Sequence, residues 1–306
     1  MKKYILLFTT LFCFSCGNNQ KKTENKEKAE VVNEDKQLNI TFLLDLSDRI
    51  EPTKYPNSPE HYQRDIALID EFVSVFKSNM KEGGVLKMRG KMRVLFNPAP
   101  KDPAINQIAQ KLDVNTSIMK NAEKKRLYNS IQEDYNENLR AIYEKTLKTK
   151  NYIGSDIWRF FKNDVKNFAI DDNPIYRNIL VIITDGYIYH EDTKFKEGNR
   201  MSYILPQTAK SLGLTKSDWE EKIDKMDFGL IAPCKGLDNL EVLILEVNPT
   251  KNNSPYEEDI LKKVLKKWLS EMGVKHSEIY STDLPNNTKI NIGNFMKRYE
   301  DKDSKK

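Results

Sequence analysis

The chain has 306 residues, of which 39% are hydrophobic and 31% are charged, and its formal net charge is +5. These values are typical of a globular protein with a polar surface, holding one large domain or two small ones. No dense run of Lys and Arg is interleaved with aromatic residues, which argues against a nucleic-acid partner.

The first residues indicate an export signal. Lys2 and Lys3 precede an apolar run over residues 4–14, which is too short to cross a bilayer as a stable helix. A short positive segment followed by such a run is typical of a signal peptide, which we place at residues 1–15. Removal of this segment lowers the net charge to +3, because both lysines leave with it.

The residues around Cys16 resemble the lipobox of bacterial lipoproteins. Ser15 fits that pattern, whereas Cys13 and Phe14 depart from it. The resemblance implies that Cys16 is acylated and that the exported protein is anchored by lipid to a membrane of the bacterial cell envelope. A cleaved secretory signal with an incidental cysteine is the alternative.

The segment that follows predicts a flexible tether over residues 16–36. It has few apolar residues and cannot bury enough surface to offset the entropy of ordering. The domain is therefore expected over residues 37–306. An acylated Cys16 would leave Cys234 without a partner, so the core must be stable without a disulfide.

The first part of the domain predicts a buried strand that ends at Leu44. A helix follows, with Ser58 as its expected N-cap and apolar residues spaced by three and four over residues 62–80. Residues 85–88 and 92–96 are strand candidates joined by a hairpin turn. The stretch over about 118–150 predicts a helical insertion.

The second part continues the alternation of helices and strands. Ser155 is the expected cap of a new helix, and a continuous apolar run over residues 179–183 predicts a central strand. A long excursion over residues 187–239 precedes another strand, helix, strand and helix. This order predicts an α/β fold, Rossmann-like, with a mostly parallel central sheet and helices on both faces.

Oxygen-bearing side chains stand where these elements begin or end. Asp45, Ser47 and Asp185 follow predicted strands, and Ser155 opens a predicted helix. In an open parallel sheet such positions share one edge, and their oxygens suit Mg²⁺ or another divalent cation. Each motif alone also fits an ordinary turn or cap.

Together, the motifs resemble the metal-ion-dependent adhesion site of von Willebrand factor A domains. Asp45 and Ser47 match the first two positions of its Asp-x-Ser-x-Ser loop, and Asp185 matches its later aspartate. Ser155 stands where the family has Thr. Arg49 stands in place of the second Ser, so its guanidinium is a possible metal substitute that pairs with Asp45 or Asp185.

The resemblance implies a membrane-anchored binding module that uses this metal site to bind an unknown protein partner. A metal-dependent hydrolase using Asp45 and Asp185 is one alternative, although no general base is evident. A metal-free envelope scaffold in which Arg49 fills the site is the other. The sequence therefore leaves open whether the protein is an enzyme.

Overall fold

The computed structural model describes residues 36–249 and 254–297, and its centre is a six-stranded sheet. The strand order is β3-β2-β1-β4-β8-β9, and every neighbouring pair is parallel except β2 and β3. The strands are β1 (Gln37–Leu44), β2 (Lys91–Leu95), β3 (Val114–Asn115), β4 (Tyr176–Ile183), β8 (Glu241–Val247) and β9 (His276–Ser281).

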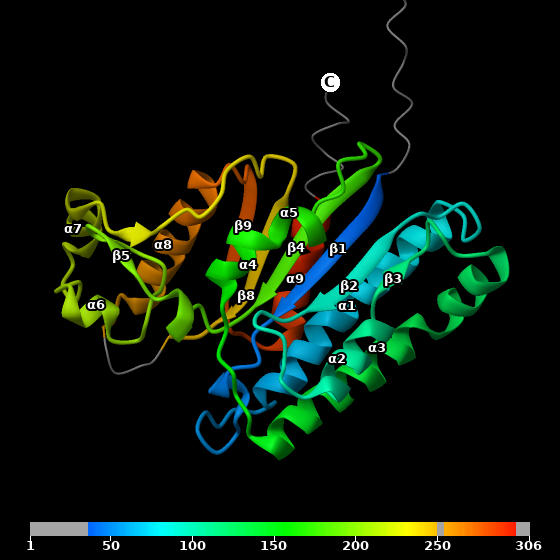
Figure 1. The fold of residues 1–306 in the computed structure, drawn as a ribbon, viewed down its shortest axis with the longest axis horizontal. Helices are drawn as coiled ribbons and strands as arrows, with labels where there is room; N and C mark the ends of the chain where they lie inside the picture. The colour runs from blue at the N-terminus through cyan, green and yellow to red at the C-terminus, as the bar shows by residue number, and fades with distance from the viewer. Residues whose placement is uncertain (1–35, 250–253, 298–306) are drawn as a thin grey trace, which may run out of the picture. The chain divides into compact units, whose positions relative to one another are not determined.

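Helices cover both faces of this sheet (Figure 1). One face packs on α1 (His61–Glu82), α2 (Pro103–Lys111), α3 (Asn121–Thr149) and α9 (Pro285–Lys297). The other face packs on α4 (Ile157–Asn163), α5 (Val165–Phe168) and α8 (Glu257–Glu271). The predicted α/β class with a mostly parallel sheet covered on both sides is confirmed.

Alternation along the strands explains the two cores. Phe42 of β1 points into the core shared with α1, and its neighbour Leu43 points into the core shared with α8. All eight residues of β4 are buried, as expected for a central strand that is covered on both faces. Both cores contain aromatic contacts, such as the edge-to-face pair of Phe161 and Trp268, whose ring centroids lie 4.7 Å apart.

The excursion after β4 forms a small sheet of its own and packs into the second core through residues such as Ile188 and Phe228. Its elements are η2 (Glu191–Thr193), β5 (Lys196–Glu197), β6 (Arg200–Met201), α6 (Thr208–Ser211), α7 (Trp219–Met226) and β7 (Gly229–Leu230). Its first residues continue directly from the end of β4, so it begins at the edge of the sheet where the candidate site lies.

Two local predictions are wrong. Residues 85–88 form turns instead of a strand, with Lys87 N–H donating to the carbonyl of Gly84 at 2.8 Å, and β2 pairs in parallel with β1 instead of closing a hairpin. Helix α1 is capped at Glu60 instead of Ser58, because the Gln63 side chain accepts a hydrogen bond from the Glu60 N–H at 3.1 Å.

The predicted signal peptide, the acylated Cys16 and the tether up to residue 35 lie outside the described residues. None of the helices within residues 36–249 and 254–297 combines the length and the apolar character that crossing a membrane requires.

Candidate functional site

Asp45 and Asp185 lie at the carboxyl ends of two neighbouring strands. Asp45 directly follows β1 and Asp185 follows β4 by two residues, and the two strands run parallel with Leu44 opposite Ile183. The Asp45 N–H donates to the Ile183 carbonyl at 3.1 Å, which continues the ladder past the strand ends. We call this edge of the sheet, with Asp45 and Asp185, the rim.

The Asp45 carboxylate is buried, and each of its oxygens accepts a hydrogen bond. Its Oδ1 accepts from the backbone N–H of Ser47, and its Oδ2 accepts from the hydroxyl of Thr184, both at 2.8 Å. The exposed fraction of Asp45 is only 2%. Ser47 therefore binds the Asp45 carboxylate through its backbone N–H. The side-chain hydroxyl bound to that carboxylate comes from Thr184, which the sequence did not single out.

Arg49 lies beneath the rim in η1 (Asp48–Ile50) and is buried. Its Nε donates to the Asp45 carbonyl at 3.2 Å and lies 3.7 Å from Oδ2 of the same residue, while its Nη2 donates to the Ile183 carbonyl at 3.3 Å. The guanidinium thus binds the ends of both β1 and β4.

The main partner of Arg49 is Asp65 of α1. Arg49 Nη2 donates to Asp65 Oδ2 at 2.6 Å, and the same carboxylate oxygen accepts from the Tyr143 hydroxyl at 2.8 Å. Burial alone would lower the pKa of Arg49, but the charges of Asp65 and Asp45 outweigh it and raise the pKa above its ordinary value. Sequence reasoning considered Asp45 and Asp185 as partners of Arg49 and missed Asp65.

Asp185 is half-buried at the rim. Its Oδ1 accepts from the Tyr187 N–H at 3.0 Å, which orients the carboxylate. The pKa of Asp185 is raised to about 7, mainly by burial and secondly by the charge of Asp45. Arg49 opposes this rise, but its charge is shared with Asp65 and Asp45. The rim therefore has more negative charge than its buried cation compensates.

Ser155 takes a different place from the one expected. Asp156 caps α4 instead, because its Oδ1 accepts from the Arg159 N–H at 3.0 Å. Ser155 itself forms an isolated antiparallel bridge with Tyr189 at the start of the excursion. Within the described part of the chain, no hydrogen bond connects Ser155 with Asp45 or Asp185.

A pocket of about 390 Å³ opens at the rim. Charged or titratable residues contribute much of its lining, and prolines, asparagines and a threonine contribute the rest: Arg49, Lys54, Tyr55, Pro56, Asn57, His61, Asp185, Tyr187, Pro206, Glu246, Asn248, Pro249 and Thr282. Of the predicted site residues, Asp185 and Arg49 line this pocket, whereas Asp45, Ser47 and Ser155 do not.

Glu246 is a second pocket carboxylate that the sequence did not reveal. It sits at an irregularity of β8 with a φ of 69°, a left-handed conformation that costs energy for a residue other than glycine. Its Oε2 accepts from Arg64 Nε and from the Thr282 hydroxyl, each at 2.8 Å. The pKa of Glu246 is raised, mainly by burial and secondly by the charge of Asp65. A charged residue within an apolar strand was the only signal available.

Of the two rim carboxylates, only Asp185 is placed to coordinate a divalent cation. The oxygens of Asp45 accept hydrogen bonds, and a guanidinium lies 3.7 Å from one of them. Asp185 reaches the pocket, where water could complete the coordination of Mg²⁺. Among the residues that the structure describes, no group of three or more His, Cys, Asp or Glu side chains is arranged to hold a metal ion.

Comparisons with known proteins assign no family. No family model matches the chain, and no curated protein matches it. An aerotolerance-related membrane protein from Bacteroides fragilis aligns with a TM-score of 0.41 and 12% identity over 85% of this chain and 99% of that protein.

Two further solved structures align less well. The pilus adhesin SpaC from Lactobacillus rhamnosus GG gives a TM-score of 0.38 and 11% identity over 85% of this chain and 29% of that protein. Proximal thread matrix protein 1 from the mussel byssus gives a TM-score of 0.31 and 13% identity, over 77% of this chain and 48% of that protein. At these TM-scores and identities, the likenesses assign neither a family nor a function to this chain.

Proposed function

We propose that the chain is a lipid-anchored binding module of the bacterial cell envelope, with a von Willebrand factor A-like domain whose rim binds a protein partner. The observation that carries this proposal is the place of Asp185, a half-buried carboxylate that lines the 390 Å³ pocket at the carboxyl end of a central strand. Open α/β sheets bind their ligands at this edge.

We further propose that Arg49 takes the place of a metal ion next to Asp45. The guanidinium lies 3.7 Å from the Asp45 carboxylate and is held by Asp65 at 2.6 Å, so positive charge is built into the rim. In this version a positively charged group of the partner binds Asp185 directly. In the metal-dependent version, Asp185 holds a divalent cation through one oxygen and water, and an acidic group of the partner completes its coordination.

Calorimetric titration of the full chain with Mg²⁺ and with Mn²⁺ separates the two versions. We expect no saturable heat that depends on Asp185. Heat that saturates in the wild type and vanishes in Asp185→Ala would establish the metal-dependent version. Asp48→Ala is the matched control, because Asp48 is a nearby carboxylate that pairs with Lys54 and does not line the pocket.

A hydrolase is the second candidate, and His61 is the observation that favours it. His61 lines the same pocket as Asp185, and burial together with the charge of Arg49 lowers its pKa, which keeps the imidazole neutral near pH 7. A neutral imidazole can serve as a general base. Turnover of a phosphoester or peptide panel that is lost in both His61→Gln and Asp185→Ala would support this candidate. Turnover that survives His61→Gln would remove His61 from it.

A further inference from the structure

The edge of the sheet opposite the rim is where the described chain begins. Lys36 immediately precedes β1, and helix α1 ends at this same edge, with Gly83 as its C-cap (Figure 1). The loop after α1 is joined to the first strand, because the Arg89 N–H donates to Gln37 Oε1 at 2.7 Å. Any segment that precedes Lys36 therefore enters the domain beside this loop.

The start of α3 lies against the same loop. The ammonium group of Lys124 donates to the carbonyls of Leu86 and Met88, at 3.1 and 2.7 Å, and the Thr116 hydroxyl donates to the carbonyl of Gly90 at 2.8 Å. Residues 82–89 and 117–126 thus form one continuous area, which with Lys81 we call the amino-edge surface.

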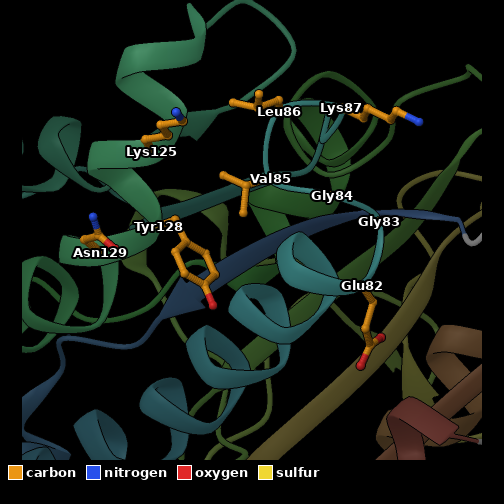
Figure 2. Close-up of a pocket in the computed structure, with 9 residues that line it drawn as sticks. All are labelled: Glu82, Gly83, Gly84, Val85, Leu86, Lys87, Lys125, Tyr128 and Asn129. Atoms are coloured by element: carbon orange, nitrogen blue, oxygen red, sulfur yellow. The ribbon is translucent and has the colours of Figure 1, made fainter.

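Apolar side chains are exposed on the amino-edge surface. The exposed fraction is 81% for Ile118 and 43% for Leu86, and these are two of the few large hydrophobic residues that the described part of the chain exposes. An open pocket of about 610 Å³ lies beside Leu86, between the loop and α3. Figure 2 shows Leu86 and Val85 on the loop side of it and Tyr128 and Lys125 on the helix side.

The amino-edge surface is also strongly basic. Seven Lys and Arg residues and only two Glu residues give it a net charge of +5, and all of them except Lys124 are exposed: Lys81, Glu82, Lys87, Arg89, Lys120, Glu123, Lys124, Lys125 and Arg126. This value equals the net charge of the whole chain, so the positive charge is concentrated here. Exposed apolar side chains surrounded by lysines are the features of a protein surface that binds anionic lipid.

We propose that the amino-edge surface docks on an anionic membrane, with Leu86 and Ile118 entering the headgroup region and the surrounding lysines meeting the lipid charges. The point at which the predicted tether would join the domain, at Lys36 just before β1, supports a membrane over a protein as the occupant. Only 19 residues lie between Cys16 and Lys36, so the lipid anchor of the proposed function would keep this edge close to the bilayer, at a root-mean-square tether span of roughly 25 Å. Docking would turn the rim, at the other ends of the strands, away from the membrane.

Hydrogen exchange of the full chain on vesicles tests this proposal without any protein partner. The chain is reconstituted in vesicles of phosphatidylcholine alone and in vesicles that also contain phosphatidylglycerol. We expect several-fold slower exchange of residues 84–88 and 117–120 on the anionic vesicles, and loss of this protection at high salt, which screens the lipid charges.

Charge reversal supplies the matched variants. Lys87→Glu/Lys125→Glu is expected to remove the protection, whereas Lys210→Glu/Lys216→Glu, on exposed lysines of the excursion, is expected to leave it unchanged. Equal exchange on both vesicles would overturn the proposal, as would protection that survives the first reversal. Protection that appears only after a protein is added would assign the surface to that protein instead of lipid. Because no rim residue is changed, these outcomes are independent of partner binding at Asp185.

Discussion

Nη2 of Arg49 lies 2.6 Å from Oδ2 of Asp65, and both side chains are almost completely removed from solvent. This ion pair connects the loop after β1 with the first turns of α1, and Tyr143 of α3 adds a hydrogen bond to the same carboxylate. The positive charge next to Asp45 is therefore held by side chains of two helices, which explains how an arginine buried beneath the rim can be stable.

Removal of one partner of this pair should destabilise the fold strongly. In Asp65→Asn the shape is kept, but the buried guanidinium of Arg49 loses its compensating charge. We expect the free energy of unfolding to fall by roughly 3 to 5 kcal/mol, as measured by urea denaturation. Asp48→Asn, which breaks the exposed pair with Lys54, should change it little. An equally small effect of Asp65→Asn would show that Arg49 does not depend on this partner.

The raised pKa of Asp185 predicts a pH-dependent effect on stability. Between its ordinary pKa and about 7, the folded state holds a proton at Asp185 that the unfolded state has released, so this group lowers stability as the pH rises through that window. Asp185→Asn removes the charge and can keep the hydrogen bond from Tyr187. The variant should match the wild type near pH 4 and exceed its unfolding free energy above pH 7 by up to about 4 kcal/mol, since the rise spans about three pKa units.

Urea denaturation at several pH values between 4 and 8 measures this difference. A difference that is the same at every pH would contradict the raised pKa, because only a titrating group makes the gap grow across the window.

Gly186 next to Asp185 should resist substitution. Its φ is +96°, and a Cβ at this position would lie 3.1 Å from Cγ1 of Val247, so Gly186→Ala adds both backbone strain and a close contact. Gly213 also has a positive φ, +67°, but a Cβ there meets nothing within 4 Å. We expect Gly213→Ala to cost about 1 to 2 kcal/mol and Gly186→Ala to cost more, as read from thermal unfolding. Equal losses of stability in the two variants would mean that the Val247 side chain moves away from the new methyl group at no cost in free energy.

The sequence predicted the elements whose pattern is local. The apolar runs before Asp45 and Asp185 set both strands, and parallel pairing then brought the two aspartates to one edge. Asp65 escaped prediction because the apolar spacing of α1 gives the face that turns to the sheet but not the charged side chain, Arg49, that the fold brings to it. Glu246 escaped for a similar reason, since its partner Arg64 is 182 residues away in the chain.

The errors have equally physical causes. Residues 85–88 are apolar enough for a strand, but Gly84 with a φ of 81° begins turns instead, and Lys124 reaches the carbonyls of Leu86 and Met88 that a strand would have paired. Ser155 is of a residue type that is favoured at N-caps, but the neighbouring Asp156 carboxylate accepts the hydrogen bond from the helix.

Site-specific photo-crosslinking in the bacterial envelope tests the central claim, that a partner binds at Asp185 without a metal ion. A photoreactive residue replaces Tyr55, which lines the rim pocket and is 44% exposed, and a control replaces Phe168, which is 42% exposed and lies outside the pocket. We predict a discrete crosslinked product at position 55 and not at 168, lost in Asp185→Ala and unchanged by a metal chelator. A product that persists in Asp185→Ala, or that disappears with the chelator, would contradict the claim.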